Sequence, residues 1–111
     1  MQAKFTYAIR FTDDMEGSVA FFRDKLGLTL RFSTPFWSEF DTGAVTLALH
    51  PASAENPAGT VQLGFATDDV VRLHAQAEAE GLIFSGAPRE EHGTKLARIR
   101  DPEGAEINLS S

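Results

Sequence analysis

The sequence contains no cysteine among its 111 residues. This absence excludes disulfide bonds, thiolate nucleophiles and zinc sites built from cysteine. Basic residues are also scarce, because 10 Lys and Arg stand against 16 Asp and Glu, giving a net charge of −6. Binding to nucleic acid or to an anionic membrane needs a positively charged surface, so both are poor candidates as partners.

Long hydrophobic runs are missing as well. No stretch approaches the ~20 apolar residues that span a bilayer, and the N-terminus lacks the basic and then apolar segments of a signal peptide. We therefore expect a cytoplasmic protein. Apolar residues make up 42% of the chain, an ordinary share for a protein with a hydrophobic core. The length suits one compact domain, or two tightly joined halves.

The stretch from Phe5 to Leu28 combines a strand, an acidic turn and a helix. Apolar and polar residues alternate over residues 5–11, which is typical of a strand with two unlike faces. Asp13, followed three residues later by Glu16, resembles a capping box at the start of a helix. Apolar residues at helical spacing then continue over residues 15–26, so we expect the helix to fold back onto the strand.

The same pattern returns at residues 60–82, again with two aspartates between strand and helix. Each copy is followed by strand-like segments, a glycine-containing turn and a final strand. A period of about half the chain favours a duplicated module over a solenoid. We divide a single domain of residues 1–111 into module one (1–50), a linker rich in Pro, Ala and Ser (51–60) and module two (61–111).

The periodicity predicts two βαβββ modules and an α+β fold. The expected helices cover residues 15–26 and 70–80, and the expected strands cover 5–11, 29–33, 36–41, 44–50, 61–66, 83–85, 96–100 and 106–109. The polar residues 86–94 are expected to form a mobile loop. A sheet with one helix leaves its other face bare, so two such sheets would form an incomplete β-barrel that encloses a cleft. We therefore expect functional residues on the face opposite each helix.

Two segments resemble signature motifs of a known family. DDMEGSVAFFRDKLGL (13–28) resembles the opening helix of the vicinal oxygen chelate superfamily, also called the glyoxalase/bleomycin resistance/dioxygenase superfamily, and DPEGAEINL (101–109) resembles its closing turn and strand. The resemblance covers nearly the whole chain and implies the glyoxalase/bleomycin resistance-like fold and a homodimer. It does not imply one activity, because members include lyases, isomerases, epimerases, dioxygenases, thiol transferases and metal-free drug-binding proteins.

The resemblance also locates the positions at which metal-dependent members hold a divalent cation. These positions correspond to Tyr7, Ala48, Gln62 and Asn108. They supply a phenol, a methyl group and two amides, whereas a divalent cation needs several imidazole or carboxylate ligands. We therefore expect no metal and no other cofactor. If the alignment to the family is shifted so that His50 or Glu106 occupies a ligand position, a metal-dependent protein remains an alternative.

Strand parity selects further candidates for the helix-opposed face. Trp37 is the best residue to stack on an aromatic ligand, and its alternative role is to fill the core or a subunit interface. Glu39 is the best acid–base candidate, and its alternative is an ion pair with Arg98 or a solvated charge on an edge strand. Arg98 could bind a carboxylate or phosphate. His50 could act as a base, or could simply end its strand at the surface.

The leading hypothesis is a metal-free protein that binds a small molecule such as an antibiotic or an aromatic toxin. The expected ligand-binding residues are Tyr7, Trp37, Glu39, Ala48, Gln62, Arg98 and Asn108. The alternative is an enzyme of the same superfamily, of the lyase, isomerase or dioxygenase type. In that case Glu39 or His50 would be the acid–base catalyst, with or without a metal.

Overall fold

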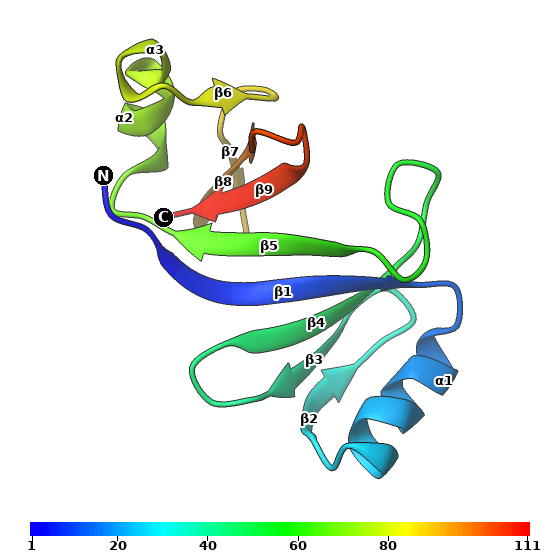
Figure 1. Ribbon diagram of the computed structural model, residues 1–111. Coiled ribbons are helices and arrows are strands. Elements are labelled where there is room, and N and C mark those ends of the chain that lie inside the picture. The colour runs from blue at the N-terminus through cyan, green and yellow to red at the C-terminus, as the bar shows by residue number, and fades with distance from the viewer. The chain divides into compact units, whose positions relative to one another are not determined.

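The computed structural model of residues 1–111 consists of two units, each a β-sheet with helices on one face (Figure 1). One unit comprises Thr6–Val61, and we call it the N-terminal unit. The other comprises Met1–Phe5 together with Gln62–Ser111, and we call it the C-terminal unit. No helix in the chain is both long enough and apolar enough to cross a membrane.

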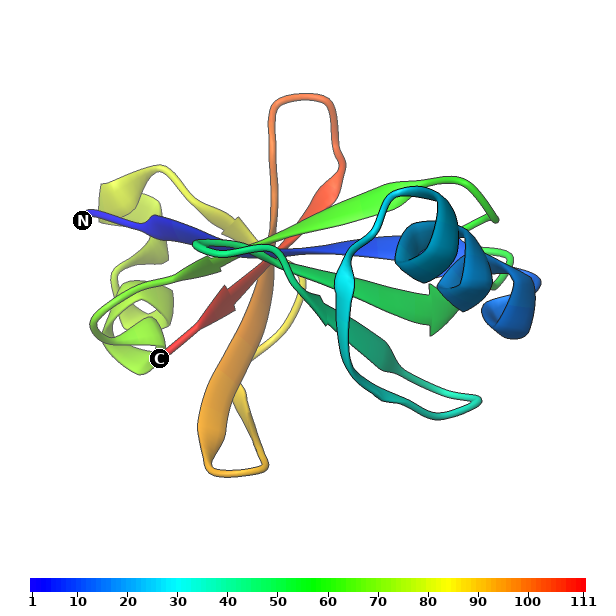
Figure 2. The same cartoon turned by 90° about the horizontal axis from the view of Figure 1, so that it is seen from below.

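The N-terminal unit contains four strands and one helical segment. Its elements are most of β1 (Lys4–Thr12), α1 (Met15–Ala20), the π-helix η1 (Phe21–Lys25), β2 (Thr29–Ser33), β3 (Ser38–Asp41) and β4 (Thr46–Pro51). The strand order is β2-β3-β4-β1, and β1 runs parallel to β4 while the other neighbours are antiparallel. α1 and η1 follow each other without a break along one side of this sheet (Figure 2).

The two faces of this sheet bury different side chains. Val19 of α1 packs with Phe40 and Leu49 on the helix-covered face, together with the partly buried Leu47. Ala48 lies between these two leucines and points to the opposite face, because successive side chains of a strand alternate. The alternation seen in the sequence therefore assigned both faces of β4 correctly.

Helix α1 begins at Asp14, whose Oδ1 accepts a hydrogen bond of 2.9 Å from the Gly17 amide. The prediction that Asp13 caps the helix is therefore wrong by one residue. The Thr12 hydroxyl oxygen accepts a hydrogen bond from the Asp14 amide at 3.0 Å, which holds the backbone at the start of the helix. A Cβ atom at Gly17 would lie 2.2 Å from Asp14 Oδ2, so glycine gives this cap its room.

Substitution of this cap should have a modest and measurable effect. We expect Asp14→Ala to lower the free energy of unfolding by about 1 kcal/mol, because the Gly17 amide loses its acceptor. Asp13→Ala, one residue earlier and also exposed, should change stability by less than about 0.5 kcal/mol. Urea denaturation of both variants measures the difference, and equal losses would contradict the assigned cap.

The C-terminal unit repeats the arrangement with two differences: its first strand is followed by two short α-helices, and it has an extra strand. Its elements are β5 (Val61–Ala66), α2 (Val70–Ala75), α3 (Ala77–Glu80), β6 (Ile83–Phe84), β7 (Arg89–Glu91), β8 (Thr94–Arg100) and β9 (Glu106–Ser110). The strand order is β5-β9-β8-β6, with β7 also paired to β8. β5 and β9 are parallel, and the other pairs are antiparallel.

The core of the C-terminal unit forms where α2 packs on the sheet. Val70 is fully buried against Ala97 of β8 and Leu109 of β9. Asp69 caps α2 by accepting a hydrogen bond of 3.0 Å from the Arg72 amide, as Asp14 caps α1 in the other unit. The predicted helix over residues 70–80 is divided at Gln76, whose backbone angles leave the helical region.

The predicted mobile loop over residues 86–94 is partly wrong. Arg89–Glu91 forms β7, which pairs with β8 through a tight turn at His92 and Gly93, both with positive φ. The sequence did not predict this strand, because β7 carries only charged residues and so shows no alternation of apolar and polar residues. The remaining order of elements confirms the predicted α+β fold of two βαβββ modules.

Candidate ligand-binding site

The face of the N-terminal sheet that carries no helix has an apolar floor. Ile9 and Phe11 of β1 and Ala48 of β4 are buried there. The cross-strand register places Ala48 between Ile9 on one side and Glu39 of β3 on the other. Tyr7 and Trp37 are partly exposed and pack against this floor. We call this surface, defined by Tyr7, Ile9, Trp37, Glu39, Thr46 and Ala48, the helix-opposed face.

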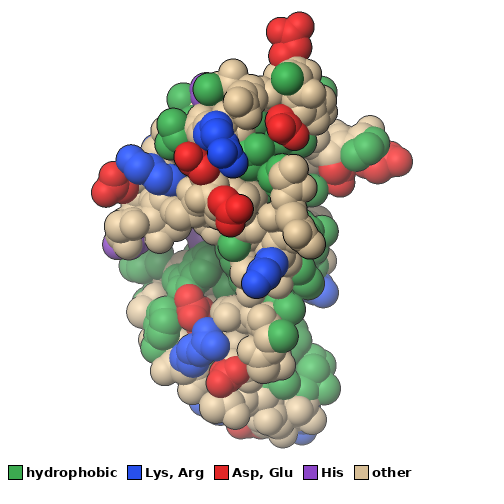
Figure 3. All heavy atoms as spheres, turned by 90° about the vertical axis from the view of Figure 1, so that its left-hand side faces the viewer, with side chains coloured by type: hydrophobic (Ala, Val, Ile, Leu, Met, Phe, Trp, Pro, Cys, Tyr) green, Lys and Arg blue, Asp and Glu red, His purple; other side chains and the backbone are tan.

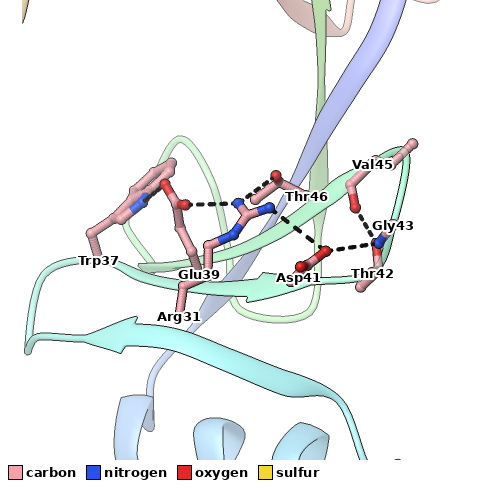
Figure 4. A network of polar contacts seen from close by, with 8 residues as sticks. All are labelled: Arg31, Trp37, Glu39, Asp41, Thr42, Gly43, Val45 and Thr46. Carbon is pink, nitrogen blue, oxygen red and sulfur yellow. Dashed lines mark hydrogen bonds and ion pairs between the residues drawn. The ribbon is translucent and has the colours of Figure 1, made fainter.

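A polar network crosses three strands of this face (Figure 4). The Trp37 indole Nε1 donates to Glu39 Oε1 at 2.9 Å, and Arg31 Nη1 donates to Glu39 Oε2 at 3.3 Å. The same Nη1 donates to the Thr46 hydroxyl at 2.9 Å, and Arg31 Nη2 lies 3.7 Å from Asp41 Oδ1. One guanidinium and two carboxylates thus form a cluster whose charges sum to one negative charge.

Arg31 is a residue of this network that the sequence did not single out. The pairing of β2 with β3 shifts register between Leu30 and Phe32, so Arg31 lies at a bulge. Leu30, the residue before it, packs on the helix-covered face, so strand alternation points Arg31 to the helix-opposed face. The ion pair considered for Glu39 therefore exists, but its partner is Arg31. The only signal in the sequence was a cation on the strand next to Glu39.

His50 lies at the end of β4, where its ring contacts two aromatic side chains. The ring centroids lie 6.0 Å from Trp37 and 5.7 Å from Phe11, both with edge-on geometry. His50 Nδ1 is 2.8 Å from the Pro51 carbonyl oxygen. Because a carbonyl only accepts, Nδ1 carries the proton in this hydrogen bond, and Nε2 of the neutral ring is left as an acceptor.

The C-terminal unit places its three predicted polar residues together on adjacent strands. Arg98 Nε donates to Asn108 Oδ1 at 3.3 Å, and Asn108 Nδ2 donates to Gln62 Oε1 at 3.1 Å. Gln62 is buried, with an exposure of 6%. The chain of hydrogen bonds runs from β8 through β9 to β5, and it fixes the orientation of both amides.

The four positions suggested for a metal do not suit a divalent cation. In the C-terminal unit, both amide oxygens already accept hydrogen bonds, and the Arg98 guanidinium lies beside Asn108. In the N-terminal unit, the positions are the phenol of Tyr7 and the methyl group of Ala48. Nowhere in the chain are three or more His, Cys, Asp or Glu side chains grouped as metal ligands. The residues present therefore lack the anionic and imidazole donors that such an ion requires.

Charges outside this face are dispersed. Figure 3 shows one face of the molecule, on which Lys and Arg side chains lie singly among acidic and apolar ones.

On η1, Arg23 donates hydrogen bonds to both oxygens of Asp24, at 2.8 and 3.1 Å. This hydrogen bonding lowers the pKa of the Asp24 carboxyl and raises that of Arg23. Both side chains are exposed, so the pair adds little to stability.

Comparison with known proteins identifies one family and several similar structures. The sequence profile described as Glyoxalase/Bleomycin resistance protein/Dioxygenase superfamily matches residues 4–109. No curated protein sequence matches the chain.

Three solved structures illustrate the shared fold. A superfamily member from Vibrio splendidus 12B01 has a TM-score of 0.70 at 16% identity, over 98% of this chain and 97% of its own. A methylmalonyl-CoA epimerase variant from Streptomyces coelicolor, in complex with 2-nitronate-propionyl-CoA, has a TM-score of 0.74 at 18% identity, over 96% and 92%. A Legionella pneumophila protein described as an NAD-dependent benzaldehyde dehydrogenase has a TM-score of 0.73 at 15% identity, over 94% and 96%. The TM-scores establish a common fold, and at such low sequence identities the likeness shows nothing beyond the fold. The activities described for these proteins differ from one another.

Proposed function

The chain belongs to the glyoxalase/bleomycin resistance protein/dioxygenase superfamily, and on this premise we propose that it is a metal-free protein that binds a small, partly aromatic molecule. The observation that carries the proposal is the helix-opposed face, where Trp37 is held by Glu39 above an apolar floor. Binding would be stoichiometric and would change no covalent bond. An antibiotic or aromatic toxin would be kept from its target by sequestration.

Trp37 is suited to stacking because its polar group already has a partner. The indole N–H donates to Glu39, so the ring is oriented before a ligand arrives. A planar aromatic ligand gains apolar burial and about 0.5–1.5 kcal/mol from an offset-stacked pair. Preorganisation of this kind reduces the conformational entropy lost on binding.

The charge of the network favours a cationic group on the ligand. Arg31 is shared between two carboxylates, those of Glu39 and Asp41, so the network keeps an excess of negative charge. The Glu39 side chain is 25% exposed and remains accessible to a ligand. In the C-terminal unit, we assign polar contacts with the ligand to Gln62, Arg98 and Asn108.

The proposal includes a homodimer in the cytoplasm. β2 is an edge strand of the N-terminal sheet, and its Phe32 is 46% exposed. Exposed strand edges favour pairing with another chain, and a dimer would cover them. A mass of one chain, 12.1 kDa, in light scattering at micromolar concentration would contradict this part of the proposal.

Binding can be tested directly because Trp37 is the only tryptophan in the chain. We expect bleomycin or the planar cationic dye acriflavine to bind saturably in calorimetry and to change the intrinsic Trp37 fluorescence. An anionic aromatic dye of similar size should bind more weakly, because the network is negative. Heat of binding without a fluorescence change would place the ligand elsewhere, and the absence of both with a broad panel of aromatic compounds would contradict the proposal.

Metal content gives an independent prediction. Protein purified without chelators should contain far less than one equivalent of Ni, Zn, Fe or Mn per chain, because the candidate positions offer amides, a phenol and a methyl group. Inductively coupled plasma mass spectrometry measures the metal content per chain. Buffer passed over the same purification column is the control. One equivalent per chain that survives dialysis would overturn the metal-free assignment.

An enzyme of the same superfamily is the second candidate. Its support is His50, whose Nε2 is left as an acceptor beside Trp37. Glu39 or His50 would then act as general base on a bound substrate. If Glu39→Gln abolishes turnover of a substrate while leaving its binding intact, the protein is an enzyme and the sequestration mechanism is wrong.

A further inference from the structure

A separate hollow of about 520 Å³ lies in the N-terminal unit. It is bounded by the end of β1, by α1 and η1, and by Ala58 and Gly59. None of the residues of the Trp37 network lines it. Its volume falls in the range of small-molecule pockets, about 300–1,000 Å³. The proposed function makes no use of this hollow.

The guanidinium group of Arg10 lines part of this hollow. Arg10 Nη1 donates to the Gly59 carbonyl oxygen at 2.8 Å, which fixes the side chain against the loop. Arg10 forms no ion pair with an acidic side chain, whereas Arg23, Arg31 and Arg89 each do. A guanidinium has five N–H donors in a planar fork, so donors remain that match a carboxylate.

A carboxylate lines the same hollow. Asp14 Oδ1 is occupied by the Gly17 amide, but Oδ2 accepts no hydrogen bond within the chain. This oxygen is available to an ammonium group. Because one hollow presents both a cation and an anion, a ligand with only one charge would leave the other group without a partner or would be repelled by it.

The lining also includes aromatic rings, the small side chains of Thr12, Ser18 and Ala58, and two glycines. Phe21 of η1 is 49% exposed and makes an edge-on contact with Phe22, with ring centroids 5.3 Å apart. Gly17 and Gly59 contribute only backbone to the lining. A half-exposed phenylalanine in a concave surface gains burial and ring stacking when an aromatic ligand covers it.

We propose that this hollow binds a free α-amino acid with an aromatic side chain. The ligand carboxylate pairs with Arg10, the ammonium group pairs with Asp14, and the ring covers Phe21. This site is distinct from the helix-opposed face, so the protein would bind two different small molecules.

Calorimetry with three related compounds tests the assignment. L-phenylalanine carries both charges, 3-phenylpropionate lacks the ammonium group and 2-phenylethylamine lacks the carboxylate. We expect L-phenylalanine to bind at least about tenfold more tightly than either analogue, because each lost charge pair removes a charge-assisted hydrogen bond. No binding of L-phenylalanine, or binding no tighter than that of 3-phenylpropionate, overturns the proposal.

Two variants test the residues, and each has a matched control. Arg10→Gln and Asp14→Asn should each weaken L-phenylalanine binding by about tenfold or more, and asparagine preserves the helix cap. Arg100→Gln is the control for the first, because Arg100 also donates to a glycine carbonyl, that of Gly104, at 2.9 Å. Asp69→Asn, which changes the cap of α2, is the control for the second.

The outcomes also separate this site from the proposed function. Circular dichroism must show that all four variants keep the wild-type fold. Binding that survives Arg10→Gln and Asp14→Asn but disappears in Trp37→Ala would place the amino acid on the helix-opposed face and overturn the second site. Failure of bleomycin and acriflavine to bind, with intact L-phenylalanine binding, would overturn the proposed function and leave the second site standing.

Discussion

Phe40→Ala should lower the free energy of unfolding by about 3–5 kcal/mol, the usual cost of removing a buried aromatic ring. Phe40 has 0% exposure on β3 and packs with Val19 and Leu49, and its ring centroid lies 5.9 Å from that of Phe22. Proteins of this size have unfolding free energies of about 5–15 kcal/mol. We therefore expect the thermal midpoint to fall by about 15 °C or more. Urea and thermal denaturation followed by circular dichroism measure both quantities.

Phe36→Ala is the matched control for this prediction. It removes the same ring four residues earlier, where the side chain is 75% exposed, and should change stability by less than about 0.5 kcal/mol. If Phe40→Ala does not fold, Phe40→Leu measures the same site at a smaller cost. Similar losses for Phe36→Ala and Phe40→Ala would show that the burial of β3 has been assigned wrongly.

The alternation of buried and exposed side chains along a strand could be predicted from the sequence. Over residues 37–40 the period of two placed Trp37 and Glu39 on one face and Phe40 on the other, and the structure confirms this with the hydrogen bond from Trp37 to Glu39. Side-chain direction in a strand depends only on neighbouring residues, so it can be predicted without knowing the partners of the strand. The duplicated order of strands and helix was predicted from the same signal.

Partners across strands could not be predicted, because they depend on register. Arg31 reaches Glu39 because β2 pairs with β3, and the register of that pair shifts between Leu30 and Phe32 without a clear mark in the hydrophobic pattern. The hydrogen bond from Asn108 to Gln62 depends in the same way on the parallel pairing of β5 with β9. The assignment of these residues to ligand binding stays a prediction.

Helix caps and charged hairpins are a second kind of feature that the sequence could not locate. Asp13 and Asp14 are identical in type, and only the backbone angles at the helix start select Asp14 as the cap. β7 contains charged residues alone, so its pairing with β8 leaves no trace in the apolar pattern. Sequence patterns report which side chains enter a core, and both features lie outside the core.

Trp37→Ala should weaken the binding of bleomycin or acriflavine by roughly 30-fold to 1,600-fold. Loss of the indole removes apolar burial of about 1.5–3 kcal/mol and stacking of about 0.5–1.5 kcal/mol, and each 1.4 kcal/mol corresponds to about tenfold in affinity. Trp37 is partly exposed, so the protein should remain folded. Trp37→Phe keeps a ring that can stack, and should lose roughly tenfold or less. Calorimetry is the appropriate measurement, because neither variant contains tryptophan.

Glu39→Gln separates the aromatic contribution from the electrostatic one. Glutamine keeps an oxygen that accepts the hydrogen bond from the Trp37 indole, but it removes the negative charge that pairs with Arg31. Binding of cationic acriflavine should therefore weaken, while binding of an uncharged aromatic compound of similar size should change little. If acriflavine binds Trp37→Ala as tightly as it binds the wild-type protein, the helix-opposed face is not where it binds. Equal weakening of both compounds by Glu39→Gln would instead mean that the residue orients Trp37 and does not recognise ligand charge.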